Sequence, residues 1–439
     1  MPRVLAVAYD VGPASPAQPR VAALLREFVR RGAEVWLWTE RDPGPWAAEL
    51  AANGRFRAVV VADPVARGYA HLLRRSRSPT VASAGTAAPR SPSSAGGITA
   101  WAWRLGARLQ QALLFPDNQV LWSRRVARRV GAEARAGDLV LTCSRPESVG
   151  CIGPRVQRQG ARWWLDFADG WCFQGLRREA MTPGRRRERE LELERRWVGA
   201  ADLVSTVDDL LAESFGRLRQ GGEVAVLPNL VPDEFGGREP DPSPTPPPGD
   251  ALPTIGYFGR ISLSDPERTL EPLLGLLRRD GGRHRARFCF HGEYRAEDRR
   301  EIAAIAALGH EVSVADPLPR ERLVAQRRSF AAMVVVTSPG QRGSSSKLLD
   351  ALGLALPVLA IVPEDSIAAR IVRDCGCGMV VPFEALGHAE GLWAQFLEGV
   401  RLGRYRLEPG LRERYTSAAF VPALVDRAFR MVGAAETPR

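Results

Sequence analysis

Short apolar runs recur along the chain, and longer amphipathic segments separate them. Apolar runs bounded by turn residues predict buried strands, and segments of helical period predict helices. The predicted strands of the first half span 4–9, 57–62, 138–142, 162–167, 202–206 and 223–229, with a further strand ending near Trp38. Those of the second half span 253–259, 288–292, 311–316, 331–336, 357–362 and 378–383. Strands that alternate with helices are typical of parallel sheets, so the sequence predicts an α/β protein with two doubly wound domains.

A proline-rich stretch divides the two sets of strands. Residues 238–253 contain seven prolines, which exclude a helix or strand interior and predict an extended linker. We therefore expect an N-terminal domain over 1–237 and a C-terminal domain over 254–410. Within the first domain, residues 75–100 are rich in Ser, Ala, Pro and Gly and predict a long loop.

The segment at 98–115 allows two interpretations. Trp101, Trp103 and Arg104 would suit a helix lying on a membrane surface. A helix that faces the protein core is the favoured interpretation, because a membrane-surface helix should show a broad and strongly cationic polar face.

Composition narrows the class of protein. The chain has 439 residues, with 45% hydrophobic and 25% charged residues, as expected of a globular protein. A net charge of +11 admits nucleic acid, an anionic membrane surface or a phosphorylated substrate as partner. The six cysteines have no ligand-like spacing, and we interpret them as free thiols in a reducing compartment. The N-terminal residues lack the features of a signal peptide, and no run of apolar residues is long enough to span a membrane. We therefore expect a cytoplasmic protein.

The distribution of cations singles out one position. Of 61 Lys and Arg residues, Lys347 is the only lysine. Codon bias toward arginine explains the rest, yet lysine is a compact point charge that the planar guanidinium does not replace. Lys347 follows Gly343 and three serines and begins a predicted helix, where free backbone N–H groups and a cation together favour an anion. A capped helix with a chance lysine is the alternative.

The flanking strands strengthen the prediction of an anion site. The loop follows the predicted strand at 331–338, and another strand begins at residue 357. Open α/β sheets bind ligands at the carboxyl ends of their strands. The loop is not a Walker motif, because Ser346 precedes the lysine and Leu348 follows it.

Four stretches carry a resemblance to a known family. They are the strand and loop at 8–20, SRPESVGCIG with DFADGW (144–153 and 166–171), TIGYFGR (254–260), and SSSKLLDAL followed by PVLA. The chain resembles the retaining, nucleotide-sugar-dependent glycosyltransferases of the GT-B fold over roughly residues 3–430. The resemblance implies two Rossmann-like domains facing a cleft and a C-terminal segment, within 411–439, that crosses back to the first domain.

The resemblance implies a set of donor-binding residues. The nucleotide would lie on the C-terminal domain, and Gly12 would approach its diphosphate from the opposite wall. Relatives have lysine where this chain has Arg268, and glutamate where it has Asp350. The implied contacts to phosphate, sugar and ribose are Arg260, Arg268, Ser344, Ser345, Ser346, Lys347, Leu348 and Asp350, with Asp316 and Leu318 framing the base.

The acceptor side departs further from the family. Relatives often carry a histidine near the sugar, in or just after the stretch that matches 144–153, where this chain has Glu147 and Gly150. Asp166 and Asp169 remain, and an acidic pair at a strand end could position the acceptor or act as a base. N-capping of the next segment is the alternative for Asp169. His291 also ends a strand and is interpreted as structural.

These observations lead to one predicted function and three alternatives. We expect sugar transfer from a UDP-, GDP- or dTDP-linked donor to a saccharide, lipid-linked or small-molecule acceptor. The resemblance implies retention of configuration and no metal or other cofactor. The composition suggests a GC-rich bacterial source, and the basic surface allows association with the inner face of a membrane. The alternatives are a GT-B sugar-nucleotide epimerase, a non-catalytic GT-B-fold binding protein and, least favoured, a nucleic-acid binder.

Overall fold

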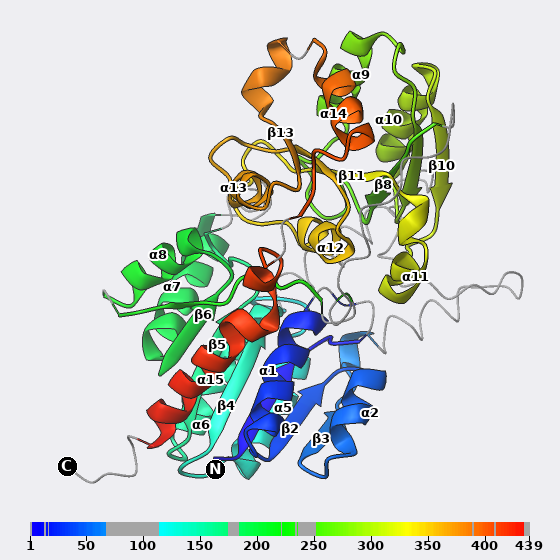
Figure 1. Cartoon of the computed structure of the whole chain (residues 1–439). Coiled ribbons are helices and arrows are strands. Elements are labelled where there is room, and N and C mark those ends of the chain that lie inside the picture. The colour runs from blue at the N-terminus through cyan, green and yellow to red at the C-terminus, as the bar shows by residue number, and fades with distance from the viewer. Residues whose placement is uncertain are drawn as a thin grey trace, which may run out of the picture.

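The chain forms two separate parallel sheets, each covered by helices on both faces (Figure 1). The structure is a computed structural model. It describes residues 2–12, 15, 17–66, 114–173, 184–220, 222–232, 235, 252–388, 390–407 and 410–433. The predicted loop at 75–100, nearly all of the segment at 98–115 and most of the proline-rich linker lie outside the described residues. The α/β architecture expected from the apolar pattern is confirmed.

The first sheet is built from the N-terminal half of the chain. Its strand order is β3-β2-β1-β4-β5-β6-β7, and all neighbouring strands are parallel. The order reverses between β1 and β4, which creates a switch point at the carboxyl ends of these two strands. The strands are β1 (Val4–Ala8), β2 (Val35–Thr39), β3 (Phe56–Val60), β4 (Leu139–Ser144), β5 (Arg162–Phe167), β6 (Leu203–Thr206) and β7 (Ala225–Val226).

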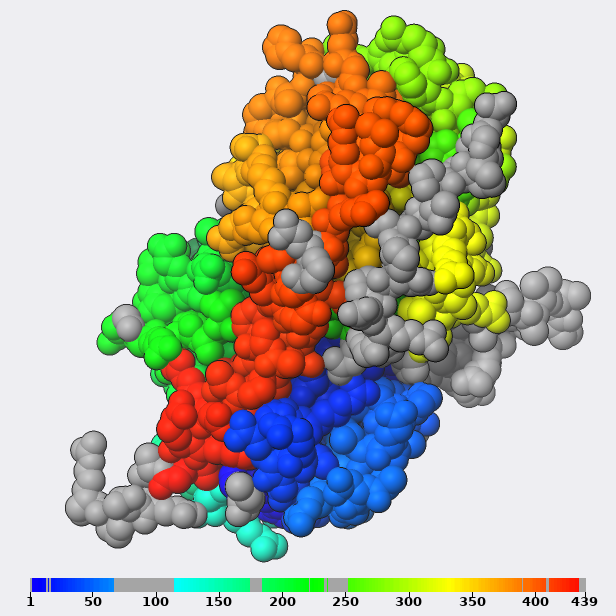
Figure 2. Space-filling view, viewed as in Figure 1, coloured from blue at the N-terminus to red at the C-terminus, as the bar shows by residue number. Residues whose placement is uncertain are grey.

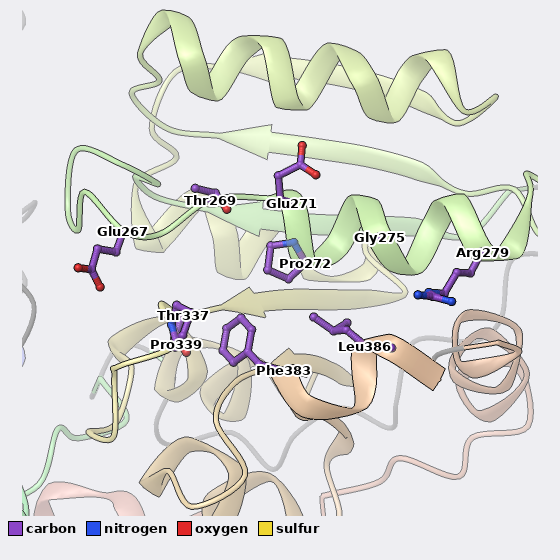
Figure 3. Close-up of a pocket in the computed structure, with 11 residues that line it drawn as sticks. Glu267, Thr269, Glu271, Pro272, Gly275, Arg279, Thr337, Pro339, Phe383 and Leu386 are labelled. Carbon is purple, nitrogen blue, oxygen red and sulfur yellow. The ribbon is translucent and has the colours of Figure 1, made fainter.

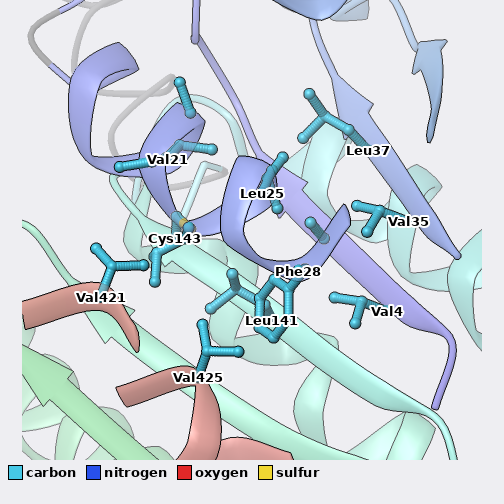
Figure 4. Packing of buried hydrophobic residues seen from close by; sticks show 14 of the residues in the cluster. Val4, Val21, Leu25, Phe28, Val35, Leu37, Leu141, Cys143, Val421 and Val425 are labelled. Carbon is cyan, nitrogen blue, oxygen red and sulfur yellow. The ribbon is translucent and has the colours of Figure 1, made fainter. Parts of the chain in front are cut away.

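Two apolar cores flank the first sheet. One face packs against α1 (Gln18–Arg30), α2 (Pro45–Ala51) and α15 (Ser417–Gly433), around Phe28 and Val425 (Figure 4). The other packs against α5 (Val120–Glu133), η1 (Glu147–Cys151), α6 (Gly153–Gln157), α7 (Gly184–Ala200) and α8 (Asp209–Leu218). The last described helix of the chain thus completes the core of the first domain, and Figure 2 shows the C-terminal segment running down onto it.

The second sheet repeats the same topology. Its order is β10-β9-β8-β11-β12-β13, again all parallel, with a switch point between β8 and β11. The strands are β8 (Thr254–Phe258), β9 (Arg287–His291), β10 (Glu311–Ala315), β11 (Ala332–Val336), β12 (Val358–Ile361) and β13 (Gly378–Val381).

Helices also cover both faces of the second sheet. On one side lie α9 (Glu271–Asp280), α10 (Ala296–Ala307) and α14 (Leu392–Arg401), with η4 (Phe383–His388) beside them. On the other lie α11 (Arg320–Ala325), α12 (Ser346–Leu354) and α13 (Ile367–Asp374). The short turns η3 (Arg327–Ser329) and η5 (Glu413–Tyr415) complete the described elements.

The boundary between the domains differs from the sequence prediction in one respect. Val231 and Phe235 pack into the second core, where the ring of Phe235 lies against Gly353, although the predicted first domain extends to residue 237. The predicted strand at 223–229 is only two residues long, because Pro228 cannot donate to a ladder hydrogen bond and the chain turns toward the second domain. Among the described helices, none is long and apolar enough to cross a membrane.

Candidate functional site

The switch point of the second sheet gathers most of the predicted donor residues. The loop after β8 carries Gly259, Arg260 and Arg268, and the loop after β11 carries 337–345 and leads into α12. Because β8 and β11 are neighbouring parallel strands, their carboxyl ends and both loops lie at the same edge of the sheet. The structure therefore brings Arg260, Arg268 and the Ser344–Lys347 segment to one place.

Lys347 is held over the end of β8 in a fixed orientation. Its Nζ donates to the hydroxyl of Tyr257 at 2.9 Å and to the carbonyl oxygen of Arg260 at 2.8 Å. The ammonium also lies 4.4 Å from the centre of the Tyr257 ring, within the range of a cation–π contact. All of these partners are neutral, so the positive charge of Lys347 is oriented without being neutralised by a direct contact.

The pKa of Lys347 reflects this environment. Desolvation by the surrounding protein lowers the pKa well below that of a free lysine, and the nearby Arg268 guanidinium lowers it further. The carboxylates of Asp350 and Asp298 oppose this effect only in part. An anion bound beside Nζ would favour the charged form of the lysine and raise its pKa again.

Arg268 is a second buried cation, and no carboxylate in the described part of the chain contacts it. The residue is only 9% exposed, its Nη2 donates to Gln341 Oε1 at 3.0 Å, and its Nε has no hydrogen-bond partner among the described residues. A buried guanidinium N–H that lacks an acceptor is costly, and a bound phosphate oxygen would satisfy it.

Gly259 permits the close approach of Lys347 to β8. Its φ is +96°, a conformation that favours glycine, and a Cβ at this position would lie 3.2 Å from Cε of Lys347. Its N–H donates to the carbonyl oxygen of His291, which joins the ends of β8 and β9. The roles of Gly259 and Tyr257 could not be predicted from the sequence, because both depend on where Lys347 lies.

Two predicted donor residues face other partners in this structure. The guanidinium of Arg260 pairs with Glu293, with Nη2 and Oε2 2.7 Å apart, and both side chains are exposed. Asp350 accepts from Arg320 Nε at 3.3 Å. Both lie on the correct side of the sheet, and each would need to exchange its partner in order to contact a nucleotide.

The serine loop reaches across to the first domain. Ser345 caps α12 through its backbone, Ser346 begins the helix and is exposed, and Ser344 Oγ accepts from Asn229 Nδ2 at 3.2 Å. Gly343 lies against the carboxylate of Asp208, since a Cβ there would be 3.1 Å from Oδ2. The loop that would cradle the diphosphate is thus also a contact between the domains, which the sequence did not reveal.

The residues predicted to frame the base lie at the edge of the sheet. Asp316 follows β10 and is exposed, while Leu318 packs at the margin of the second core. Leu348 is fully buried in that core, so its side chain holds α12 in place. His291 Nδ1 lies 3.3 Å from the carbonyl oxygen of Asp316, and its ring stacks on Phe258, which agrees with the structural role expected for it.

On the acceptor side, Asp166 occupies a structural ion pair. The carboxylate is 0% exposed, accepts from Arg20 Nε at 2.8 Å, also contacts Arg20 Nη2, and accepts from the Ser205 hydroxyl. Arg20 continues to the carbonyl oxygen of Leu227. The sequence places Asp166 where it could contact an acceptor. In this structure its carboxylate oxygens are instead enclosed between β5, β6 and α1.

The other acceptor-side candidates remain near the strand ends. Asp169 follows β5, its side chain is 56% exposed, and Oδ2 lies 3.6 Å from Arg145 Nε. Glu147 is buried in η1 after β4. Gly12 follows β1, and its N–H donates to Asp10 Oδ1 at 3.2 Å.

A carboxyl that the sequence analysis did not identify lies close to Glu147. Burial raises the pKa of Asp117 to about 6, and the charge of Glu147 adds to the effect. Asp117 accepts from the backbone N–H of Ser148 at 2.7 Å and from its hydroxyl at 2.8 Å. These bonds tie the beginning of α5 to η1.

A cavity of about 460 Å³ lies beside the donor loop (Figure 3). Pro272, Gly275 and Arg279 of α9 form one wall, Phe383 and Leu386 of η4 form another, and Thr337 and Pro339 lie at the end of β11. The cavity therefore borders the root of the loop that leads to Lys347. Among the described residues, no group of three or more His, Cys, Asp or Glu side chains is placed to hold a metal ion.

The chain resembles known proteins in its fold but not in its sequence. The sequence matches no family profile and no curated protein. The structure resembles sucrose-phosphate synthase from Thermosynechococcus elongatus, with a TM-score of 0.62 at 14% identity over 99% of this chain and 100% of that chain. It also resembles a glycosyltransferase from Rickettsia africae (TM-score 0.60, 11% identity, 98% of each chain). A third is Anabaena HepE in complex with UDP-glucose (TM-score 0.53, 12% identity, 99% of this chain and 97% of that chain). The neighbours are GT-B glycosyltransferases, and with its two parallel sheets of seven and six strands this chain has the GT-B fold.

Proposed function

We propose that the protein transfers a sugar from a nucleoside-diphosphate sugar to an acceptor hydroxyl. The observation that carries the proposal is the position of Lys347. Its Nζ is held by neutral hydrogen-bond acceptors at the switch point of the second sheet. Arg268, with its unpartnered Nε, supplies a second positive charge nearby. Solved structures with the same fold hold UDP-glucose or UDP, which supports a nucleotide at this sheet.

The chemistry places developing charge next to these cations. As the bond between the anomeric carbon and the diphosphate oxygen breaks, negative charge grows on the departing nucleoside diphosphate. Fixed positive groups and helix N–H groups that face this charge stabilise the transition state. Lys347, Arg268 and the N-terminus of α12 can supply that stabilisation, so the proposal requires no metal ion.

The acceptor hydroxyl forms the new bond to the anomeric carbon and loses its proton. Asp169, exposed at the end of β5, is the group that we propose takes this proton or orients the acceptor. The resemblance of the chain to retaining enzymes leads us to propose retention of configuration.

A non-catalytic binding protein with the same fold is the second candidate. The observation in its favour is the enclosure of Asp166 by Arg20 and Ser205, which leaves the acceptor side with fewer accessible acids than the sequence suggested. Such a protein would bind nucleotide as tightly but would neither transfer nor hydrolyse the sugar.

The test is a panel of UDP, GDP, ADP, CMP and dTDP in thermal-shift and calorimetric titrations against wild type and Lys347→Ala. A ligand that binds only the folded state raises the melting temperature. Loss of one charge-assisted hydrogen bond corresponds to about 1.5–3 kcal/mol, so we expect about a 10- to 150-fold weaker affinity in Lys347→Ala.

Arg342→Ala is the matched control. Arg342 lies on the same loop, and its guanidinium is 2.7 Å from Asp365 on the surface, so its loss should change affinity little. If no nucleoside diphosphate stabilises wild type, or if both variants lose affinity equally, the proposed donor site is incorrect. Binding without turnover of the matching nucleotide sugar would favour the non-catalytic candidate.

A further inference from the structure

Helix α5 presents an outer face that consists almost entirely of arginine. Arg124, Arg125, Arg128 and Arg129 are all exposed, whereas Trp122, Val126 and Val130 of the same helix are buried against the first sheet. Positions separated by three and four residues share one side of a helix, so the four guanidinium groups emerge together. They occupy about one and a half helical turns.

These arginines lack carboxylate partners within the described part of the chain. None forms a salt bridge, and the nearest polar contact is Arg125 Nη1 to the carbonyl oxygen of Ala62 at 3.5 Å. Glu133, the only acidic residue of α5, lies in its last turn, where its backbone carbonyl accepts from Arg3. Within the described part of the chain, no carboxylate therefore neutralises the positive charge of this face.

The neighbouring helix α6 extends the basic surface. Arg155 reaches over α5, since a Cβ at Gly131 would lie 2.6 Å from its Nε. Arg158 follows directly after α6 and donates to the carbonyl oxygen of Pro154. Both are exposed and, like those of α5, have no carboxylate partner among the described residues. We call Arg124, Arg125, Arg128, Arg129, Arg155 and Arg158 the α5–α6 basic face.

Several exposed arginines on other helices are paired with carboxylates. Arg195 pairs with Glu192, Arg217 with Glu213, and Arg401 with Glu398. Arg373 pairs with Glu364 in the same way. Arg299 and Arg300 of α10 are also exposed and have no carboxylate partner among the described residues. Helix α5 differs in carrying four such arginines on one side.

The basic face lies beside the acceptor side of the candidate site. Helix α5 begins where β3 ends, because Trp122 Nε1 donates to the carbonyl oxygen of Val61 at 2.6 Å. Ser123 and Ser148 share a hydrogen bond of 2.7 Å, which joins α5 to η1 after β4. A partner bound along α5 would therefore adjoin the carboxyl ends of the first sheet's strands.

We propose that the α5–α6 basic face docks this protein on an anionic phospholipid bilayer. Each arginine near such a surface strengthens binding by about 1 kcal/mol, or roughly fivefold, so a cluster of this size is sufficient for peripheral attachment. Leu121, 41% exposed at the beginning of the same helix, adds an apolar contact at the headgroup level. Docking in this orientation would bring the acceptor side of the candidate site close to the bilayer.

The geometry favours a membrane over nucleic acid. Helix α5 packs along its length against the sheet, so it offers a broad outer face and does not project as a helix that enters a DNA groove. No aromatic residue lies on the exposed side of α5, whereas single-stranded nucleic acid is usually bound by stacking on aromatic rings. A bilayer requires neither feature.

The experiment is flotation of the purified full-length protein with vesicles, in the absence of nucleotide and acceptor. Vesicles of phosphatidylcholine alone are compared with vesicles containing one-third phosphatidylglycerol. We expect wild type to bind only the anionic vesicles and to dissociate at high salt, because screening shortens the range of the attraction. Since no sugar chemistry is involved, this result is independent of the proposed function.

Two quadruple variants test the location of the surface. In the first, Arg124, Arg125, Arg128 and Arg129 become Gln, and we expect vesicle affinity to fall at least tenfold. In the matched control, Arg195, Arg217, Arg373 and Arg401 become Gln, which removes the same formal charge from paired positions, and we expect less than a threefold change. Arg124→Gln/Arg128→Gln serves as a milder variant if the quadruple change impairs folding.

Several outcomes would overturn the proposal. Equal losses in the two quadruple variants would show that net charge alone governs binding. Failure of wild type to bind anionic vesicles would exclude the membrane. Tighter binding of a duplex or single-stranded oligonucleotide, unaffected by competing anionic vesicles and lost in the α5 variant, would assign the face to nucleic acid.

Discussion

The two domains differ in whether a carboxylate pairs with their buried arginines. In the first domain, Arg20 near the start of α1 forms a bidentate pair with Asp166, and both side chains are buried. In the second domain, Arg268 lies in the corresponding crossover after the first strand, yet its contact is the neutral side chain of Gln341 and its Nε is unpartnered. Lys347 nearby also contacts only neutral oxygens.

The difference separates an arginine that is paired within the fold from two cations that have no direct counterion among the described residues. Burying a cation destabilises the folded state unless a counterion pairs with it, and in the first domain Asp166 is that counterion. The second domain leaves two cations without direct counterions at the end of one sheet, where an external anion would complete them. Loss of Asp166 should therefore affect stability, whereas changes at Lys347 should affect ligand affinity.

The largest effect that we expect is a loss of stability of the first domain. Asp166→Ala leaves Arg20 buried without its counterion, and breaking such a pair costs about 3–5 kcal/mol in the free energy of unfolding. All tryptophans except Trp393 lie within the first 237 residues, so denaturant unfolding followed by tryptophan fluorescence reports mainly on this domain. Nucleotide affinity of the folded fraction should be unchanged.

Asp169→Ala is the control for that variant. Its carboxylate is exposed, and the distance to Arg145 is 3.6 Å, so we expect a loss of less than about 1 kcal/mol. A similar loss for both variants would contradict the contrast between a structural and an accessible carboxylate.

The next effect concerns the pH dependence of nucleotide binding. Because the pKa of Lys347 is well below its usual value, the lysine becomes neutral as the pH rises, and only its charged form attracts phosphate. Affinity should therefore fall as the pH rises through the lowered pKa of Lys347, below the pH at which a free lysine loses its proton, by at most tenfold per pH unit for a single proton. Calorimetry in buffers of different ionisation enthalpy should detect proton uptake on binding.

Lys347→Ala provides the reference for this measurement, since it should show weak binding with little pH dependence. A flat pH profile in wild type would mean that Lys347 stays fully charged in the free protein. Proton release on binding would have the wrong sign for a lysine whose pKa is raised by the ligand.

The smallest effect tests how Lys347 is positioned. Gly259→Ala places a Cβ 3.2 Å from Cε of Lys347 and requires a residue with a side chain to adopt φ +96°, which costs about 1–2 kcal/mol. We expect a small loss of stability together with several-fold weaker nucleotide binding.

Gly275→Ala gives the opposite expectation. Gly275 lies within α9 with open space around its Cα, so alanine should stabilise the helix by up to about 1 kcal/mol without affecting the lysine. Weaker nucleotide binding in Gly275→Ala as well would point to the neighbouring cavity as part of the ligand site.

The sequence by itself determined the architecture and singled out the loop at Lys347 as a candidate anion site. Apolar runs separated by amphipathic helices are a local property, and they fix both sheets and the strand ends at which loops collect. Lys347 stood out because it is the only lysine and because small residues precede it at a helix start. These features depend on neighbours in the chain, so they can be predicted without coordinates.

Only the tertiary structure decided which charges are neutralised. Asp166 meets Arg20, Arg260 meets Glu293, and Asp350 meets Arg320, each from a separate element of the fold. The same holds for α5, whose arginines resemble those of α7 in sequence but have no carboxylate partner among the residues that the structure describes. Whether a charge is paired depends on which side chains the fold brings within a few ångströms, and that distance is set by packing between distant segments.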